Sequence, residues 1–375
     1  MVTEVDREQV LAYRAAAQGL DRSTRNLSKL AVLDIGFQDT PAGSAAVALA
    51  ARLVEMPTNE DLIGDESLVF AWTIRGAPHL HRRADITMLA PALWPLSEED
   101  ARARLAAFGS DMKKAGRSAL EAQAETAKAM RAAVKRPMTK GETSGAATKL
   151  APDYVALWCR SCKSTHIHEQ LFKLSALPAG LELTTNRSPL MLAPIDGRPR
   201  IPTRARGTGS LIRAYLTFLG PATDSEVASF LGTNRSLIGA AWPEELAEVS
   251  IEGKPAWLPR TRLASLKKAR PESMVRLLPP YDPYIQARDR GLLLADKAQQ
   301  KSLWRGLLGA PGAVFTDGEI TGVWRAKMTG KKRLVVTVDV FRPTTKRAGK
   351  ALESEAEIVA GARGASDVEV AHGSF

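Results

Sequence analysis

The stretch "TGSLIRAYLTFLG" (208–220) opens the part of the chain whose fold is easiest to predict. Its apolar residues recur at helical spacing up to a terminal glycine, and "PATDSEVASFLG" (221–232) and "TNRSLIGAAWPEEL" (233–246) predict two further helices. "LAEVSIEGKPAWLP" (246–259) predicts a two-stranded hairpin that turns at Glu252-Gly253. Three helices followed by a hairpin is the order of a winged helix.

The same order recurs on the N-terminal side of this stretch. Residues 6–18 and 41–55 predict helices, and residues 67–85 predict a small hairpin. Residues 97–135 predict one or two long helices that break at Gly109. The winged-helix order therefore recurs up to three times along the chain.

Two further segments are set by local signals. "TKGE" (139–142) is a capping box that opens a helix running into "YVALWCRSCKSTHIHEQLF" (154–172). Residues 312–341 are rich in β-formers, with hairpin turns expected at Asp317-Gly318 and Thr329-Gly330. The end of the chain predicts a helix and then a frayed tail.

These segments predict an α+β chain of four parts without low-complexity linkers. The parts are a first winged-helix unit (1–96), long helices with a second unit (97–205), a third unit (206–275), and a β-rich C-terminal domain with a helical tail (276–375).

Composition narrows the class of protein. The 375 residues are 45% hydrophobic and 25% charged, as in ordinary soluble proteins. No apolar run of about 18 residues and no signal peptide occur, so we expect a cytoplasmic, nucleoid-associated protein. Two cysteines exclude a disulfide scaffold, and the lack of a heptad run favours a monomer.

Charge indicates the partner. The net charge is +11, and basic residues cluster in "KKAR" (267–270), "TGKKR" (329–333) and "KRAGK" (346–350). Such clusters favour a nucleic acid partner over the alternative that the excess charge only aids solubility. No cluster lies on a strongly amphipathic helix, so no membrane contact is expected.

Four stretches together resemble the bacterial winged-helix alkylpurine DNA glycosylases of the AlkZ/YcaQ type. They are "GFQDTPAGSAAVALAARL" (36–53), "LVFAWTIRGAPHL" (68–80), "LLPPYDPY" (277–284) and "TDGEITGVWRAK" (316–327), the last continuing into "RLVVTVDVF". The resemblance implies three tandem winged helices followed by a β-barrel-like domain, with a basic concave surface for duplex DNA. It also implies base excision repair on damaged double-stranded DNA: removal of cationic alkylated purines, including the unhooking of interstrand crosslinks in some members.

The resemblance places the family's catalytic glutamine on Gln38. The second catalytic position, glutamine or aspartate in the family, falls on Thr40. A Gln38 amide is no general base, but it can position a water. Asp39 is the alternative carboxylate. Thr40 and Pro41 also read as the N-cap and first residue of the following helix, which is a purely structural explanation of this pair.

The two cysteines lie in "CRSCKSTHIHE" (159–169) beside two histidines. Cys159, Cys162, His166 and His168 are four candidate ligands of a structural zinc, although only three residues separate Cys162 from His166. The alternative is an unligated turn with partly buried cysteines. The resemblance requires no cofactor.

Candidate DNA contacts come from three places. The first hairpin offers His79 beside basic residues, the third helix opens with polar residues, and the last hairpin is basic. They are Arg75, His79, Arg82, Arg83, Asn234, Arg235, Ser236, Arg325, Lys327, Lys331, Lys332 and Arg333. Each group also has a structural explanation, such as a satisfied histidine, a packing face or a lysine-protected strand edge.

Two questions stay open at this level. Asp282 either fixes the turn into the C-terminal domain or lies close to Gln38. The chain is a DNA glycosylase, a non-catalytic winged-helix DNA-binding protein such as a regulator, or a zinc-stabilised scaffold for RNA or protein.

Overall fold

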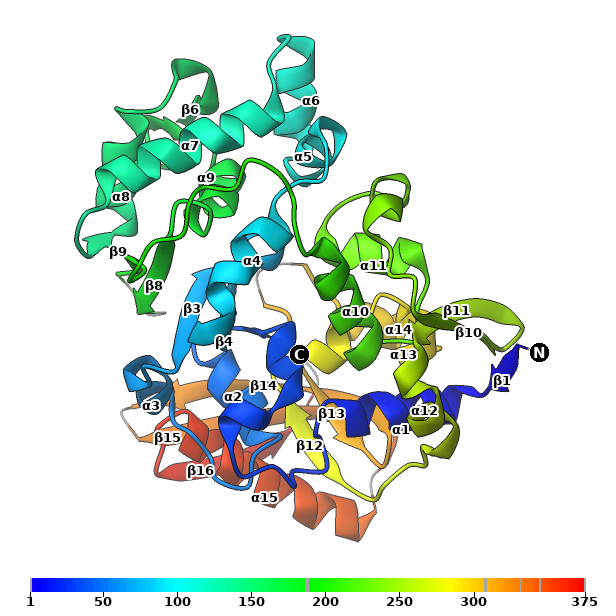
Figure 1. The fold of residues 1–375 in the computed structure, drawn as a ribbon. Helices are drawn as coiled ribbons and strands as arrows, with labels where there is room; N and C mark the ends of the chain where they lie inside the picture. Colours follow the sequence, from blue (N-terminus) through cyan, green and yellow to red (C-terminus); the bar gives the residue numbers. More distant parts are fainter. Residues whose placement is uncertain (1, 186–188, 307–308, 331, 344, 374–375) are drawn as a thin grey trace. The chain divides into compact units, whose positions relative to one another are not determined.

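Helices and sheets are interspersed along the whole chain (Figure 1), which confirms the predicted α+β class. The structure is a computed structural model that describes residues 2–185, 189–306, 309–330, 332–343 and 345–373. It divides into two compact units: unit 1 holds residues 1–65, 213–226 and 244–375, and unit 2 holds residues 66–212 and 227–243. The number of winged helices, the four predicted boundaries and the barrel-like form of the C-terminal domain stay predictions.

Unit 1 contains two sheets in its described residues. The smaller sheet has the order β1-β10-β11, with β1 parallel to β10 and β10 antiparallel to β11. The larger has the order β12-β13-β14-β15-β16, in which only the last pair is parallel. The strands of these two sheets are β1 (Thr3–Val5), β10 (Leu246–Ile251), β11 (Lys254–Pro259), β12 (Val275–Leu278), β13 (Gly312–Thr316), β14 (Glu319–Thr329), β15 (Arg333–Val340) and β16 (Asp367–His372). The short strand β2 (Phe37–Gln38) also lies in unit 1 but belongs to neither sheet.

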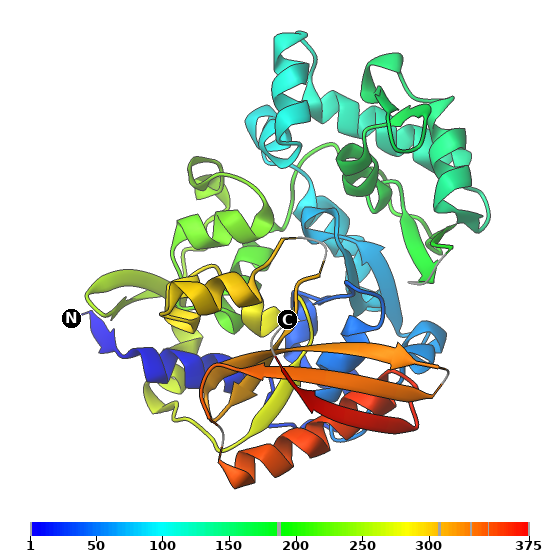
Figure 2. The same cartoon turned by 180° about the vertical axis from the view of Figure 1, so that it is seen from behind.

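The helices of unit 1 pack against these sheets. Helix α15 packs on β12 and against α2, and Figure 2 shows it alongside the layer of strands β13 to β16. The helices are α1 (Arg7–Ala17), α2 (Ser44–Ala50), α3 (Asn59–Gly64), α12 (Leu263–Lys268), α13 (Arg290–Leu293), α14 (Lys297–Leu303) and α15 (Lys346–Ala362).

Unit 2 combines an antiparallel sheet with a helical layer. Its strands follow the order β4-β3-β8-β9-β5, and a separate hairpin joins β6 and β7. The strands are β3 (Leu68–Trp72), β4 (Pro78–Arg82), β5 (Met138–Thr139), β6 (Ala156–Cys159), β7 (Ser164–Ile167), β8 (Leu181–Thr185) and β9 (Met191–Pro194). The helices are α4 (Ile86–Leu93), α5 (Glu98–Arg104), α6 (Ala107–Lys114), α7 (Ala119–Ala133), α8 (Lys140–Thr148) and α9 (Glu169–Ala176).

The stretch from 208 to 259 follows the predicted order with one exception. Helices α10 (Thr208–Phe218) and α11 (Asp224–Leu231) and the hairpin β10/β11 are present. The helix expected over 233–246 is wrong, because this segment forms two short 3₁₀ turns. Trp242 precedes a proline, which favours extended backbone, and it is extended here (φ −66°, ψ 127°).

Three other local predictions have mixed outcomes. The hairpin turn at Glu252-Gly253 is confirmed, since both residues have positive φ (50° and 78°) as a type I′ turn requires. Gly109 does not break a helix: it lies inside α6, where a β-carbon would come within 2.2 Å of the Arg102 carbonyl oxygen. The capping box is confirmed, with Thr139 N–H donating to Glu142 at 2.8 Å and Glu142 N–H donating to the Thr139 hydroxyl at 3.2 Å.

The end of the chain differs from its prediction. Helix α15 is present, but the expected frayed tail is wrong through His372, because residues 367–372 form β16, parallel to β15. Strand β16 follows α15 after a short connection and completes the edge of the larger sheet. A helix joining two parallel strands is a common solution for such a connection.

A buried ion pair lies in the interior of unit 1. Arg52 is fully buried and Asp282 is 2% exposed, and two N–O distances between them are 2.7 Å. Arg52 also donates to the backbone and side-chain oxygens of Gln18 at 3.0 Å, and its guanidinium lies 5.2 Å from the centre of the Phe37 ring. Asp282 accepts from Tyr284 N–H at 2.9 Å, which confirms that it fixes the local turn.

Strand β4 of unit 2 carries two buried histidines. His79 and His81 are each 1% exposed, their ring centres are 5.9 Å apart, and the His81 ring is 3.1 Å from the Thr73 hydroxyl. His79 Nδ1 lies 2.9 Å from the Ala77 carbonyl oxygen. Burial lowers the pKa of His79 well below its usual value, and the positive charge of His81 and Arg75 lowers it further, against the Ala77 hydrogen bond.

We predict that Arg52→Met lowers the free energy of unfolding by about 3–5 kcal/mol, because it leaves the Asp282 carboxylate buried without its cation. Asp282→Asn keeps an acceptor for Tyr284 N–H, and the double variant should lose less than the sum of the two single changes. Chemical denaturation of the four proteins measures the coupling. Arg333→Met is the control, since the Arg333–Glu369 pair is about half exposed and should contribute less than about 1 kcal/mol. Strictly additive losses would contradict the pair's role.

The second prediction concerns pH. The folded-state pKa of His79 lies below the unfolded value near 6.5, so the unfolded chain binds more protons below that pH. The stabilising contribution of neutral His79 is therefore complete above about pH 6.5 and is lost as the pH falls, by up to about 1.4 kcal/mol per pH unit. Unfolding curves recorded between pH 5 and 7 give the free energy of unfolding at each pH. This free energy should change less with pH in His79→Gln than in the wild type. Parallel profiles would refute the assignment.

Candidate active site

Gln38 is the last residue of β2 and lies in the interior. Gln38 is 8% exposed, and its side-chain oxygen Oε1 is buried without a hydrogen-bond partner among the described residues. Phe37, the preceding residue, is fully buried against the Arg52 guanidinium. The Arg52–Asp282 pair thus lies against the side chain of the residue that precedes Gln38. A buried acceptor without a partner is rare in folded proteins and calls for a ligand or a water.

Asp39, not Thr40, caps the following helix. Helix α2 begins at Ser44, and the Asp39 carboxylate accepts from Ala45 N–H at 2.9 Å. The predicted N-cap role of Thr40 is wrong, because a turn ending in Gly43 (φ 89°) separates it from the helix. This left-handed conformation strains other residues, so the glycine sets where the helix starts. Asp39 is 3% exposed and Thr40 is half-buried.

Arg363 lies close to Asp39, although the two are far apart in sequence. Burial lowers the pKa of the Arg363 guanidinium, whereas the negative charge of Asp39 raises it. Arg363 follows directly on α15, which packs against α2. No pattern around Arg363 in the sequence indicates that it lies near Asp39. Arg52 had a weak signal: it is the one charged residue in the alanine-rich stretch 36–53 that follows Gln38 and Asp39.

A cavity of about 180 Å³ lies beside this motif within unit 1. Three of the four family-like stretches contribute to its wall, which brings together segments that are far apart in the chain. The lining includes Pro41, Ser44, Pro280, Trp324, Arg325 and Arg363. Two arginines therefore face a small cavity next to the candidate catalytic residues, an arrangement that suits an anionic group such as a phosphate.

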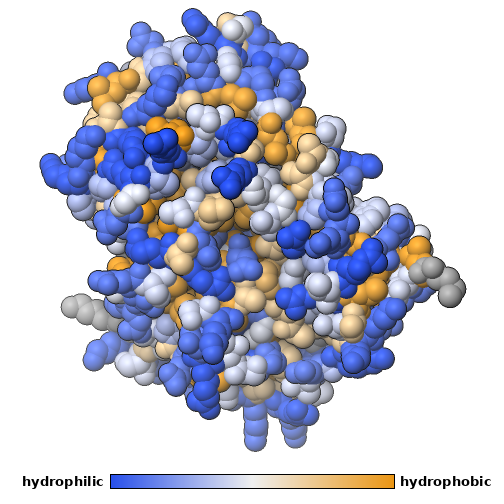
Figure 3. Space-filling model, in the orientation of Figure 1, coloured by the Kyte–Doolittle hydropathy of each residue, from blue (hydrophilic) through white to orange (hydrophobic). Residues whose placement is uncertain are grey.

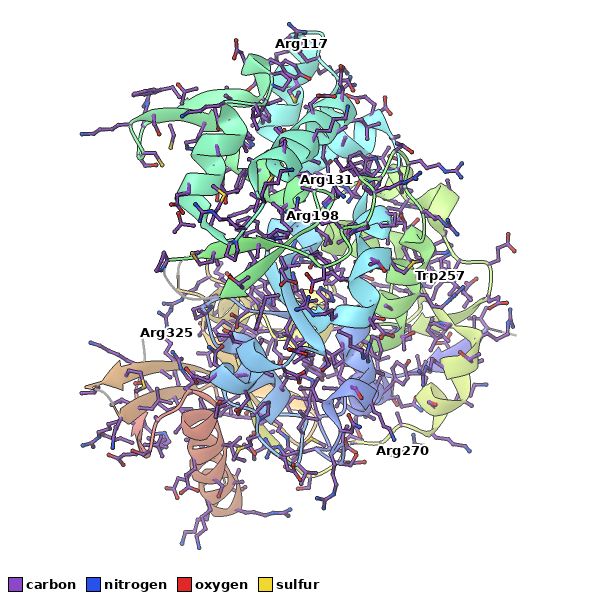
Figure 4. All side chains as sticks on the ribbon, turned by 60° about the vertical axis from the view of Figure 1, so that its left-hand side comes forward. Arg117, Arg131, Arg198, Trp257, Arg270 and Arg325 are labelled. Atoms are coloured by element: carbon purple, nitrogen blue, oxygen red, sulfur yellow. The ribbon has the colours of Figure 1, made fainter. Side chains whose placement is uncertain are left out.

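The basic hairpin of β14 and β15 carries most of the remaining candidates of unit 1. Arg325, labelled in Figure 4, lies on β14 and donates to the Gly309 carbonyl oxygen at 2.5 Å. Lys327 and Lys332 are exposed, and Lys331 lies outside the described residues. Arg333 is exposed but pairs with Glu369 at 2.5 Å, so part of its charge is compensated.

The candidates of the first hairpin mostly have partners within unit 2. Arg75 donates to the Phe230 carbonyl oxygen and lies over the Phe230 ring at 5.2 Å. Arg82 pairs with Asp85 at 3.1 Å, and Arg83 pairs with Glu182 at 2.6 Å. Their roles as phosphate contacts, and that of the buried His79, stay predictions.

The residues expected to open the recognition helix lie in an exposed turn. Asn234, Arg235 and Ser236 are all exposed, and they enter the first 3₁₀ turn, not an α-helix. A contact to DNA from this turn stays a prediction.

Hydrophilic residues dominate the face drawn in Figure 3, where apolar residues form small scattered patches.

The Cys/His segment of unit 2 forms the hairpin β6/β7. The Cys159, Cys162 and His166 ligand atoms lie within 4.8 Å of one another. His168 is not part of this group, since its ring stacks on Phe108 with 4.2 Å between ring centres. Hydrogen bonds from Ser161, then from Cys162 and His166, lower the pKa of Cys159 to about 6.

No helix in the described part of the chain is both long and apolar enough to cross a membrane.

Comparison with known proteins identifies the family. The family model described as "DNA glycosylase AlkZ-like" matches residues 33–362. The interstrand DNA cross-link repair glycosylase of Streptomyces sahachiroi is 30% identical over 181 residues, which are 46% of this chain and 47% of that protein. The matched region thus spans about half the length of that relative. The solved structure of the Streptomyces sahachiroi DNA glycosylase AlkZ aligns with a TM-score of 0.75 and 23% identity, covering 99% of this chain and 100% of that one, which shows a shared fold. Because the family model extends over most of the sequence, the chain belongs to the AlkZ-like DNA glycosylase family.

Proposed function

We propose that this protein hydrolyses the N-glycosidic bond of cationic alkylated purines in duplex DNA, including purines joined in interstrand crosslinks, with Gln38 positioning the attacking water. Family membership and the net charge of +11 support DNA as the partner. The protein acts as a monomer at the nucleoid and needs no cofactor for this reaction. The action on crosslinked purines is proposed because the Streptomyces sahachiroi relative is an interstrand DNA cross-link repair glycosylase.

One observation carries the role of Gln38. Its buried Oε1 has no hydrogen-bond partner among the described residues, while the neighbouring Asp39 carboxylate is held by Ala45 N–H. A water bound to Oε1 would satisfy the acceptor and would be oriented with a lone pair directed at the substrate. An unmet acceptor in an otherwise well-satisfied motif is what a water-positioning residue requires before its substrate arrives.

The chemistry demands little of the protein. The bond between C1′ and the purine nitrogen breaks with its electron pair going to the purine, which carries a positive charge and therefore leaves as a neutral base. The sugar passes through an oxocarbenium-like state, to which the water adds its oxygen and then releases a proton. Nearby negative charge stabilises that state. Asp39, buried beside Gln38 and near Arg363, is the carboxylate that supplies it.

Thr40 favours a second candidate function. It stands where the family has a second glutamine or an aspartate, and its side chain is shorter. A protein with a weakened second position would bind damaged DNA and excise slowly, or act as a non-catalytic winged-helix DNA-binding protein. In both functions the cavity arginines, Arg325 and Arg363, contact a backbone phosphate.

The decisive experiment compares wild type with Gln38→Ala on duplex DNA that carries one N7-alkylguanine. With protein in excess, the wild type should produce an abasic site, and the variant should excise about 10- to 100-fold more slowly, because it loses the group that positions the water. Excision is measured by alkaline cleavage of the labelled strand. Binding of the same duplex should stay within a few-fold of wild type.

Gln299→Ala, on helix α14, is the matched control for loss of a glutamine and should leave excision unchanged. Binding without any excision by the wild type would establish the non-catalytic function in place of the proposed one. Excision by Gln38→Ala at the wild-type rate would remove Gln38 from the mechanism.

Thr40 gives a test in the opposite direction. Thr40→Gln restores the family's second amide, so we expect excision several-fold faster than wild type, by up to about tenfold. Thr40→Ala should change the free energy of unfolding by less than about 0.5 kcal/mol, because Thr40 caps no helix. Single-turnover excision and chemical denaturation provide the two measurements. A loss of activity in Thr40→Ala as large as in Gln38→Ala would instead make the threonine itself part of the machinery.

A further inference from the structure

We propose that the hairpin of residues 156–167 binds one Zn²⁺ through the Sγ atoms of Cys159 and Cys162 and the Nε2 atom of His166. This site is separate from the glutamine motif and does not depend on the proposed excision activity. Three features of the hairpin support the site: its register, the positions of the three ligand atoms and the hydrogen bond of one imidazole.

The register places two of the ligands on one face. Leu157 pairs with His166 and Cys159 pairs with Ser164 across the antiparallel ladder. Residues that pair directly point to the same side, as do residues two apart in a strand, so Cys159 and His166 are diagonal neighbours on one face. Diagonal neighbours are within reach of long side chains, and an imidazole reaches across to the thiol.

The loop brings in the second sulfur. Cys162 lies between the strands, before Lys163, whose positive φ of 51° turns the chain back into β7. The Ser161 hydroxyl is 3.1 Å from the Cys159 sulfur and 3.9 Å from the Cys162 sulfur, so both sulfurs lie on one side of the loop around it. The Cys-x-x-Cys spacing of the two sulfurs is the one that zinc sites commonly use.

The distances are close to those of a metal site. All three ligand atoms lie within 4.8 Å of one another. With Zn–S bonds of about 2.3 Å, the edge of a tetrahedral site is about 3.8 Å, so the atoms need to close in by about 1 Å at most. Cys162 is exposed and Cys159 is only partly buried, so rotation of two thiols in an open loop achieves this.

The imidazole already has the orientation that a metal ligand needs. His166 Nδ1 lies 2.8 Å from the Ile167 carbonyl oxygen, and only a protonated Nδ1 can donate to it. In the neutral ring the lone pair is then on Nε2, and the ligand atoms of His166 and Cys159 lie within 4.8 Å of each other. Histidine ligands of zinc commonly donate their other N–H to a backbone carbonyl in this way.

His168 is excluded from the site by the end of the strand. Strand β7 stops at Ile167, and His168 becomes the N-cap residue of α9. Its ring stacks on Phe108 with an interplanar angle of 13°, away from the three-ligand group. The sequence-based set of four ligands thus narrows to three, and among the described residues no further His, Cys, Asp or Glu joins them. Solvent supplies the fourth ligand, which leaves an exchangeable coordination position.

The test is metal analysis of purified full-length protein loaded with ZnSO₄ under reducing conditions and then desalted. We expect about one Zn²⁺ per chain in the wild type. The bound zinc per chain should fall at least tenfold in Cys159→Ser and in Cys162→Ser, and His166→Ala should also lose most of its metal. His168→Ala is the matched control and should retain it. Zinc below about one tenth of an equivalent in the wild type, or a loss in His168→Ala equal to that in His166→Ala, would overturn the proposal.

Replacement by Co²⁺ gives an independent readout. A tetrahedral site with two thiolates should show strong visible d–d bands and a sulfur-to-metal charge-transfer band in the near ultraviolet, and added imidazole should shift the d–d bands by taking the exchangeable position. Weak octahedral bands would refute the three-ligand site, and bands unaffected by imidazole would refute the open position. Both measurements need folded protein, so the circular dichroism of each variant is compared with that of the wild type.

Discussion

The buried pair of Arg52 and Asp282 links the parts of unit 1 on which the candidate site depends. It joins the segment after α2 to the turn that follows β12, the first strand of the larger sheet, and Arg52 also donates to Gln18 and lies over Phe37. Taking two charges out of water is costly, and this cost is offset only where every hydrogen-bonding group of the pair is used. Here Arg52 uses all three of its nitrogens. A pair this demanding has few alternative arrangements, and it lies against Phe37, the residue before Gln38.

The strongest predictions from sequence were those fixed by local chemistry. Glu252-Gly253 and Asp317-Gly318 must adopt positive φ to form their turns, and the structure places both hairpins there. Predictions that depended on distant partners failed. Strand β16 forms by pairing with β15, and the sequence of residues 367–372 alone does not predict that pairing. The segment 233–246 reads as a helix by composition, but its glycine and its Trp-Pro step favour short turns.

The residues of the candidate site also differ in whether local sequence could predict them. Gln38 and Asp39 were found through a resemblance that covers contiguous residues, so position in the chain was enough. The cap was assigned to Thr40 because proline commonly follows an N-cap, yet the turn through Gly43 moves the helix start and gives the cap to Asp39. Arg363 could not be predicted, because its place beside Asp39 is a product of how α15 packs. Local sequence patterns do not predict proximity between residues so far apart in the chain.

Helix α15 has a consequence for how the protein is made. Its end supplies Arg363 to the site, and its Glu355 holds Arg22, near the opposite end of the sequence, with N–O distances of 2.6 and 2.7 Å. Domains tend to fold as units while the chain emerges from the ribosome. Unit 1 cannot complete this assembly until residue 363 has been synthesised and has left the exit tunnel. Until then, residues 1–65 lack two charges that come from the far end of the chain: the Glu355 carboxylate that pairs with Arg22, and the Arg363 guanidinium near Asp39.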